Sequence, residues 1–500
     1  KVLYVLVSDE LPQADLNILA KRLPLLKKGF TYEAIRKTTI SSLKDAKTSY
    51  KSESIMSESQ CAIYFNQILA QAVNINTSDI HISARPNEAV VKLRVNGDLI
   101  ELEHYTYDDM LKIISAAYNK LASRDSKDEH FDVKETHETA IRKSINGKFY
   151  NLRFISKPIT PSGSFNVTIR VIDESFAIEI DQLGYMDNQL SKLTKASNNH
   201  NGIVVLSGEV GSGKSVTIQS LAKYYIKLAT VGGNLTKKLV TFESPVEYPI
   251  AGAEQIEYKR NPKNSDEQER LHLEANIQSL LRMDSDACVL QEIRSKNTAQ
   301  LAIDLVQSNN LVFTTVHAQS ALQIFNRFQG LGMSIDILTE PSFLLALVYQ
   351  TLIKTPCNHC ATKLTTEHQE LKERLISLIN RYSLDESLLY NVIIINSKGC
   401  QHCHYGVSGR TIVAEIIEPT LKLLAACKNN DHQLAHKAFR EDGGITYKEH
   451  ALMKILMGQI CPLAYENKVS SLAEDNIYDD IDQNFYAKIF QDVQWGDSDA

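Results

Sequence analysis

One glycine-rich segment limits the possible folds of this chain more than any other feature. It fits the pattern G-x-x-x-x-G-K-[ST] and reads Gly208-Glu209-Val210-Gly211-Ser212-Gly213-Lys214-Ser215. The apolar run at 203–206 before it is typical of a strand buried on both faces, and apolar residues between 216 and 226 recur at helical spacing. Strand, loop and helix in this order predict a phosphate-binding P-loop in an α/β sheet. A plain glycine-rich turn is the alternative interpretation.

The chemistry of this segment indicates a nucleoside triphosphate as its ligand. Glycines let backbone N–H groups turn toward phosphate oxygens, and the helix N-terminus adds a partial positive charge. Lys214 is expected to reach the β- and γ-phosphates, and Ser215 is expected to bind Mg²⁺. We therefore predict that residues 208–215 bind ATP with Mg²⁺.

The bulk properties favour a globular protein with several domains. The 500 residues, 43% of them hydrophobic, suffice for two to four domains. No apolar run of 18 or more residues occurs, and residues 1–30 lack the order of a signal peptide, so we expect a cytoplasmic protein without a transmembrane segment. Residues 470–500 hold eight acidic residues and one lysine, which leaves the rest of the chain near neutral. This charge balance argues against nucleic acid as the main partner.

The order of the predicted elements divides the chain into five segments. Alternating apolar residues around Asn96-Gly97 predict a hairpin in an α+β region. Buried runs at 239–242, 287–290 and 311–316 alternate with helices, as in a mostly parallel sheet. The polar stretch at 122–139 is expected to form loops. The expected segments are a short N-terminal module and linker (1–56), an α+β domain (57–180), a hinge linker (181–189), an α/β domain (190–468) and an acidic tail (469–500).

Three polar residues follow the predicted strands of the α/β domain. Glu292 follows the run at 287–290 in the manner of a Walker B element, and we expect it to hold Mg²⁺ together with Ser215. Glu243 follows a second run and is our candidate for polarising the attacking water. His317 follows a third run and is expected to contact the γ-phosphate. The alternative is that residues at strand ends simply cap helices.

Four of the eight cysteines form two C-x-x-C pairs within residues 355–405: Cys357, Cys360, Cys400 and Cys403. The two-residue gap lets both sulfurs of a pair face one ion, and two pairs complete a closed tetrahedral Zn²⁺ site with a structural role. A redox pair, free thiols and an iron–sulfur cluster are the alternatives.

Together these motifs resemble the secretion ATPase superfamily, in particular the traffic ATPases of type II secretion and type IV pilus assembly. The resemblance covers residues 60–465. The segments that carry it are the Walker A box at 208–215, an Asp box at 241–247, a Walker B box at 281–294, a His box at 311–317, and the stretches 78–82 and 94–97.

The resemblance implies a RecA-like P-loop ATPase domain, a preceding α+β (PAS-like) domain and a small tetracysteine zinc-binding insertion. It implies that Arg153 and Arg170 of the preceding domain reach the triphosphate, although ordinary surface ion pairs are the alternative role. It further implies a homohexamer at the cytoplasmic side of the inner membrane, which hydrolyses ATP and acts on a membrane platform protein.

The tetracysteine element favours assembly or export, because retraction motors and type IV secretion motors of this superfamily typically lack it. Three departures from the family pattern stand out: Ser244 replaces the usual Asp, Gln291 the usual Gly, and Asn309-Asn310 the usual Gly-His. The favoured function is a motor for type IV pilus assembly. A type II secretion motor, a nucleotide-binding switch without turnover, a pilus-retraction motor and a DNA-translocating motor remain as alternatives.

Overall fold

A computed structural model describes residues 6–7, 33–34, 58–121, 130–258 and 265–472. The predicted N-terminal module and acidic tail therefore lie almost wholly outside the described residues. The chain divides into two compact units, residues 1–176 and 177–500. Two short strands near the N-terminus, β1 (Leu6–Val7) and β2 (Glu33–Ala34), pair in parallel.

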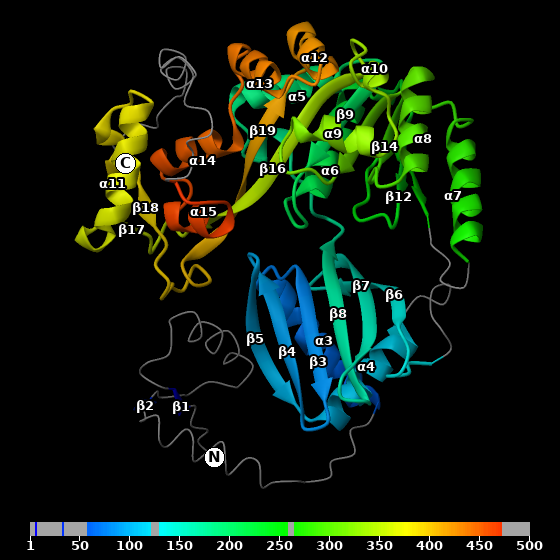
Figure 1. Cartoon of the computed structure of the whole chain (residues 1–500). Helices are drawn as coiled ribbons and strands as arrows, with labels where there is room; N and C mark the ends of the chain where they lie inside the picture. The colour runs from blue at the N-terminus through cyan, green and yellow to red at the C-terminus, as the bar shows by residue number, and fades with distance from the viewer. Residues whose placement is uncertain (1–5, 8–32, 35–57, 122–129, 259–264, 473–500) are drawn as a thin grey trace. The chain divides into compact units, whose positions relative to one another are not determined.

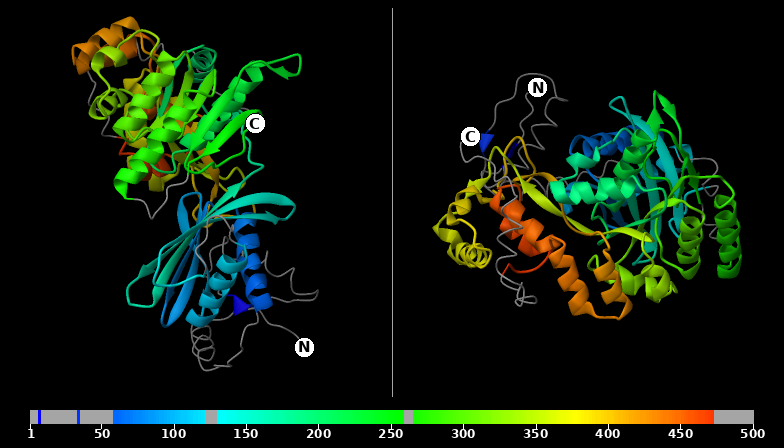
Figure 2. Two further views of the ribbon diagram at one scale, coloured as in Figure 1. Left: turned by 90° about the vertical axis from the view of Figure 1, so that its right-hand side faces the viewer. Right: turned by 90° about the horizontal axis from the view of Figure 1, so that it is seen from above.

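The first unit contains one antiparallel sheet of six strands in the order β5-β4-β3-β8-β7-β6 (Figure 1). Helices α3 and α4 lie side by side on one face of this sheet (Figure 2). The elements are α3 (Glu58–Asn74), β3 (Asp79–Arg85), β4 (Glu88–Val95), β5 (Asp98–Tyr105), α4 (Tyr107–Leu121), β6 (His137–Ile145), β7 (Lys148–Ile159) and β8 (Ser164–Asp173).

The strands of this unit alternate between a buried and a partly exposed face. In β7 the side chains of Leu152 and Phe154 are fully buried, while Arg153 between them faces the other side. The loop predicted at 122–139 is wrong at its C-terminal end, because β6 begins at His137 and includes Thr139. His137 and Thr139 occupy buried positions of that strand, so its inward-facing side chains are partly polar and the sequence lacks a clear apolar alternation.

The second unit is built on a seven-stranded sheet in the order β13-β12-β14-β15-β9-β16-β19. All neighbouring strands are parallel except β16 and β19, which are antiparallel. The strands are β9 (Gly202–Ser207), β12 (Leu239–Glu243), β13 (Ala253–Glu257), β14 (Ala287–Leu290), β15 (Leu311–Val316), β16 (Leu344–Pro356) and β19 (Val407–Ile417). A small hairpin of β10 (Thr230–Val231) and β11 (Asn234–Leu235) follows α6.

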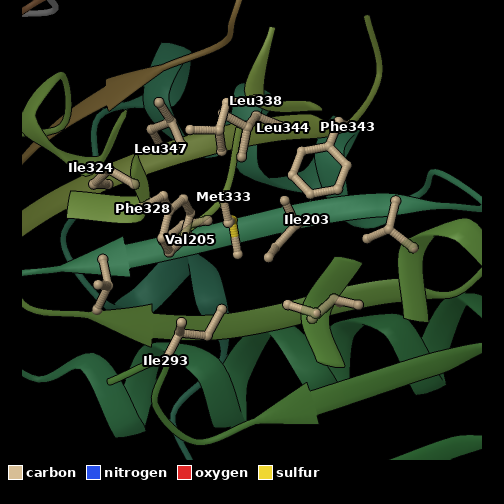
Figure 3. Packing of buried hydrophobic residues seen from close by; sticks show 14 of the residues in the cluster. Ile203, Val205, Ile293, Ile324, Phe328, Met333, Leu338, Phe343, Leu344 and Leu347 are labelled. Atoms are coloured by element: carbon tan, nitrogen blue, oxygen red, sulfur yellow. The ribbon is translucent and has the colours of Figure 1, made fainter. Parts of the chain in front are cut away.

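Helices cover both faces of this sheet, and two cores result. Val204 and Leu206 of β9 point into a core with α5 (Asp187–Ser197) and α6 (Lys214–Leu228). Ile203 and Val205 point into the opposite core, where Phe328 and Leu338 pack (Figure 3). The helices of that core include α8 (Lys296–Gln307), α9 (Gln323–Gly330), α10 (Ile335–Leu338), α12 (Leu421–Lys428) and α13 (His432–Glu441). The predicted α/β fold with a mostly parallel sheet is confirmed.

A third core includes Ile353 of β16 and Val413 of β19. Leu375 and Ile379 of an insertion between these strands pack there against Leu452 and Ile455. The elements are β17 (Thr362–Lys363), α11 (Gln369–Arg381), β18 (Ile393–Ile394), α14 (Tyr447–Leu456) and α15 (Pro462–Lys468). Helix α7 (Asp266–Leu280) follows β13, and short 3-10 helices span Ile180–Gln182, Thr366–His368 and Glu386–Asn391. No helix among the described residues combines the length and apolar character needed to cross a membrane.

One buried carboxyl group links β19 to the loop after β15. The carboxylate Oε1 of Glu415 accepts a hydrogen bond from the backbone N–H of Ala321 at 3.0 Å. Burial raises the pKa of Glu415 to about 7, and the negative charge of Glu449 adds to this effect. The group is therefore protonated in the folded chain over a pH range in which it ionises in the unfolded chain.

This pKa difference predicts how stability depends on pH. Between about pH 4.5 and pH 7 the folded state binds more protons at Glu415, so the free energy of unfolding should fall as pH rises through this range, by roughly 3 kcal/mol. Glu415→Gln removes the titrating group and should flatten this part of the profile, measured by urea unfolding at several pH values. The exposed Glu386→Gln is the control, and an unchanged slope in Glu415→Gln would contradict the prediction.

Candidate functional site

The parallel strands of the second unit bring the predicted nucleotide-site residues to one edge of the sheet. Glu243 is the last residue of β12, and Glu292 follows β14. His317 directly follows β15, and Gly208 directly follows β9. Because these four strands are adjacent and parallel, their carboxyl ends lie together. This edge is where α/β sheets bind ligands.

The P-loop has the backbone conformation that its glycines permit. Gly208, Gly211 and Gly213 all have positive φ angles, at 142°, 79° and 88°. A Cβ on Gly208 would lie 2.2 Å from the carbonyl oxygen of Gln350, so only glycine fits there. Gly213 is the N-cap of α6, which begins at Lys214, so the loop leads directly into a helix N-terminus. Such a loop can bind an anionic phosphate group.

Lys214, Glu292 and His317 form one cluster of charged and polar groups. The ammonium of Lys214 donates hydrogen bonds to the carbonyl oxygens of Gly208 at 2.6 Å and Glu209 at 2.8 Å. Burial lowers the pKa of Lys214, and the negative charges of Glu292 and Glu209 oppose this effect. The Nε2 of His317 lies 3.5 Å from Oε1 of Glu292. The structure thus brings these three predicted residues together.

Two further predicted residues of the loop differ in their contacts. Oε2 of Glu209 lies 2.5 Å from the ammonium of Lys468 in α15, so this helix contacts the loop. Ser215 is the second residue of α6 and is exposed. This is the residue whose hydroxyl the sequence predicts to bind Mg²⁺. Val210, at the tip of the loop, is 80% exposed.

Glu243 is held by hydrogen bonds at the end of β12. Its Oε1 accepts the hydroxyl of Thr241 at 2.6 Å and the amide of Gln255 at 3.1 Å. Burial raises the pKa of Glu243, while these two hydrogen bonds lower it. A carboxylate with a raised pKa at a sheet edge suits a group that accepts a proton from water.

Gln350 of β16 supports the P-loop, and no motif in the sequence marks this residue. This side chain is fully buried; its amide Nε2 donates to the carbonyl oxygen of Ser212 at 2.9 Å, and its Oε1 accepts the hydroxyl of Tyr185 at 2.6 Å. The partners are 138 and 165 positions away along the chain, so no local pattern could have revealed them.

The expected hinge at 181–189 lies within the second unit, and part of it is hydrogen-bonded to the rest of that unit. The ammonium of Lys454 in α14 donates to the carbonyl oxygen of Gly184 at 2.6 Å, to the hydroxyl of Thr411 at 2.7 Å and to the carbonyl oxygen of Ile412 at 2.7 Å. Tyr185, the next residue, is bonded to Gln350. Residues 184 and 185 are therefore fixed to the body that contains the P-loop.

The two predicted arginines lie opposite each other in the sheet of the first unit. Arg153 of β7 pairs with Arg170 of β8, and both side chains face away from the buried helical side. The Nε of Arg170 donates to the carboxylate of Asp79 in β3 at 3.0 Å. This ion pair matches the ordinary structural role that the sequence left open, and it leaves Arg170 46% exposed.

The four predicted zinc ligands form one group in the insertion between β16 and β19. The sulfurs of Cys357 and Cys400 are 3.8 Å apart, those of Cys360 and Cys403 3.6 Å, and those of Cys400 and Cys403 3.7 Å. All four lie within 4.8 Å of one another. Four sulfurs at about 2.3 Å from a central ion would be about 3.8 Å apart, so the observed distances fit tetrahedral Zn²⁺.

Backbone donors support the cysteines as thiolate ligands. The N–H of Cys400 donates to the sulfur of Cys403 at 3.2 Å, and the N–H of His402 donates to the sulfur of Cys400 at 3.4 Å. His359 and His402 stack on each other with ring centroids 4.1 Å apart, outside the group of four sulfurs. A closed set of four cysteines leaves no open position on the ion, which indicates a structural role.

Comparisons with known proteins agree with this geometry. The family model for type II/IV secretion system protein matches residues 56–469. The type II secretion system protein E of Dickeya dadantii is 25% identical over 395 residues, which are 79% of this chain and 72% of that protein. The type IV pilus assembly ATPase PilB of Pseudomonas aeruginosa is 25% identical over 411 residues, which are 81% of this chain and 67% of that protein.

Two solved structures have the same fold. The ATPase DotB of Legionella pneumophila has a TM-score of 0.58 at 18% identity, over 81% of this chain and 95% of that chain. The pilus retraction motor PilT with bound ADP has a TM-score of 0.53 at 16% identity, over 80% of this chain and 96% of that chain.

Gly208→Ala should weaken nucleotide binding, because the new Cβ meets the carbonyl oxygen of Gln350 and the backbone angle disfavours a side chain. We expect affinity for a fluorescent ATP analogue to fall at least about 10-fold. Gly211→Ala is the matched control, since it also has a positive φ but open space around the Cβ. Equal affinities of the two variants would refute the steric argument.

Metal analysis should find about one zinc per chain in the purified protein. Cys400→Ser removes one of four ligands and should lower the zinc content well below that value. Cys427→Ser is the control, because Cys427 lies outside the group of four sulfurs and should leave the zinc content unchanged. Wild-type protein with far less than one zinc per chain would refute the metal site.

Proposed function

The chain belongs to the type II/IV secretion system protein family, and we propose that it is an ATP-hydrolysing motor for type IV pilus assembly. One observation carries the proposal of hydrolysis: Lys214, Glu292 and His317 meet at the sheet edge where Glu243 ends the neighbouring strand β12. A phosphate-binding lysine, an acid for the metal and an acid for water are the groups that such a reaction needs.

Each group has a distinct proposed role. Backbone N–H groups of residues 208–215 and the ammonium of Lys214 bind the triphosphate of ATP. Ser215 and Glu292 hold Mg²⁺, which neutralises charge on the phosphates. Glu243 takes a proton from the attacking water, and His317 contacts the γ-phosphate. Burial raises the pKa of Glu243, and a more basic carboxylate is better suited to accept a proton from water.

The mechanical part of the proposal rests on the two units of the chain. We propose that Arg153 and Arg170 of the first unit reach the triphosphate held by a second unit, in the same or a neighbouring chain of a homohexamer. Guanidinium groups at this place stabilise charge on the transferred phosphoryl group. The motor would act at the cytoplasmic face of the inner membrane, on a platform protein that adds pilin subunits.

A type II secretion motor is the second candidate, and the 25% identity to type II secretion system protein E over 79% of this chain supports it. The tetracysteine group supports both candidates over a retraction motor. Nothing in the charge balance supports a DNA-translocating motor.

Glu243→Gln should abolish turnover while ATP still binds. The amide cannot accept the proton of water, so phosphate release should fall about 100-fold or more. Phosphate release and affinity for an ATP analogue are measured on the same preparation, with the surface change Glu254→Gln as the control. Wild-type protein that binds ATP without releasing phosphate would instead indicate a nucleotide switch.

The cargo is tested in the source cell with the same Glu243→Gln allele. Loss of surface pili with normal protein export supports pilus assembly. Loss of exported proteins with normal pili supports the type II secretion motor.

A further inference from the structure

The edge strand β13 carries a side chain that contacts the proposed base. Gln255 lies beside Thr241 of β12 in the parallel register, and its side chain is partly buried. Its amide nitrogen donates to Oε1 of Glu243 at 3.1 Å. Gln255 therefore reaches Glu243 from outside the strand that carries the carboxylate.

Two backbone groups fix the orientation of the Gln255 amide. Its Oε1 accepts the N–H of Ile250 at 2.7 Å, and its Nε2 donates to the carbonyl oxygen of Tyr248 at 2.9 Å. A backbone N–H can only donate and a carbonyl can only accept, so the reversed amide would lose both bonds. The N–H group, and not the carbonyl oxygen, therefore faces the carboxylate of Glu243.

Three donors define the position of this carboxylate. Besides Gln255, the hydroxyl of Thr241 donates to the same Oε1 at 2.6 Å, and the backbone of Glu247 hydrogen-bonds the carboxylate. Thr241 belongs to the same strand as Glu243, whereas the amide of Gln255 comes from the next strand. Donors from two strands hold one oxygen in place and limit rotation of the carboxylate plane.

The charge of the carboxylate also depends on these donors. Burial and the negative charge of Glu247 raise the pKa of Glu243, while the hydrogen bonds from Thr241 and Gln255 lower it. A base must be ionised before it can accept a proton. The amide of Gln255 therefore favours the reactive form of Glu243.

We propose that Gln255 is a positioning residue for ATP hydrolysis, whose amide fixes the carboxylate of Glu243 toward the attacking water. The proposal rests on the proposed function, because it assumes that Glu243 acts on water. Gln255 itself contacts no nucleotide in this scheme. Its loss should therefore affect turnover and leave nucleotide affinity almost unchanged.

The test compares two variants of Gln255 with a neighbouring control in the full-length protein. Gln255→Leu removes the amide, and Gln255→Glu keeps its shape but replaces the donor with an acceptor. Both should lower kcat for phosphate release at least about 10-fold, as expected when a hydrogen bond to a charged group is lost, while KM and affinity for an ATP analogue change less than about 2-fold. Glu254→Gln, on the adjacent exposed residue, should leave kcat unchanged.

Double variants separate positioning from a general structural effect. In a Glu243→Gln background, Gln255→Leu should cause no further loss of the residual turnover, because its effect passes through the carboxylate. An additive loss would overturn the proposal, as would a kcat of Gln255→Leu and Gln255→Glu equal to that of the wild type. Thermal unfolding shows whether Gln255→Leu or Gln255→Glu fails to fold. If one of them does, the kcat of the other variant tests the proposal. A wild type without phosphate release would instead overturn the proposed function itself.

Discussion

The parallel pairing of β9 between β15 and β16 is the constraint on which the rest of the second unit depends. It places Ile203 and Val205 in one core and Val204 and Leu206 in the other, so four consecutive residues anchor both helical layers. A shift of the register by one residue would turn each of these side chains into the wrong core. The same pairing fixes where β9 ends, and therefore where the P-loop begins relative to its neighbours.

Buried polar contacts then couple this sheet edge to distant parts of the chain. Gln350 connects the P-loop to Tyr185, and Lys454 connects Gly184 to β19. Each of these side chains is nearly or fully buried with all its contacts made inside the protein. Because an unpaired polar group in such a place costs about 1–3 kcal/mol, the contacts favour one fixed arrangement of P-loop and linker.

The sequence predicted what depends on local patterns and missed what depends on tertiary contacts. The buried strands, the P-loop and the two C-x-x-C pairs are short continuous patterns, and the α/β fold predicted from them is confirmed. The loop predicted to extend to Thr139 is too long, because the buried positions of β6 hold polar side chains that hide the strand pattern. No local sequence pattern predicts the contacts of Gln350 and Gln255, because their partners come close only when the sheet forms. Charge and periodicity describe single segments, whereas these contacts join different strands.

The departures Ser244 and Gln291 from the family pattern are in direct contact. The side-chain oxygen of Gln291 accepts the backbone N–H of Ser244, and the backbone N–H of Gln291 donates to the carbonyl oxygen of Phe242 at 3.2 Å. A glycine at position 291 has no side chain to accept that N–H. The side chain at position 291 therefore adds a bond between the ends of β12 and β14, next to Glu243 and Glu292, while residue 244 contributes only its backbone N–H. This contact joins the strand that ends at Glu243 to the strand that precedes Glu292, and so helps to fix the spacing of the two acids at the proposed nucleotide site.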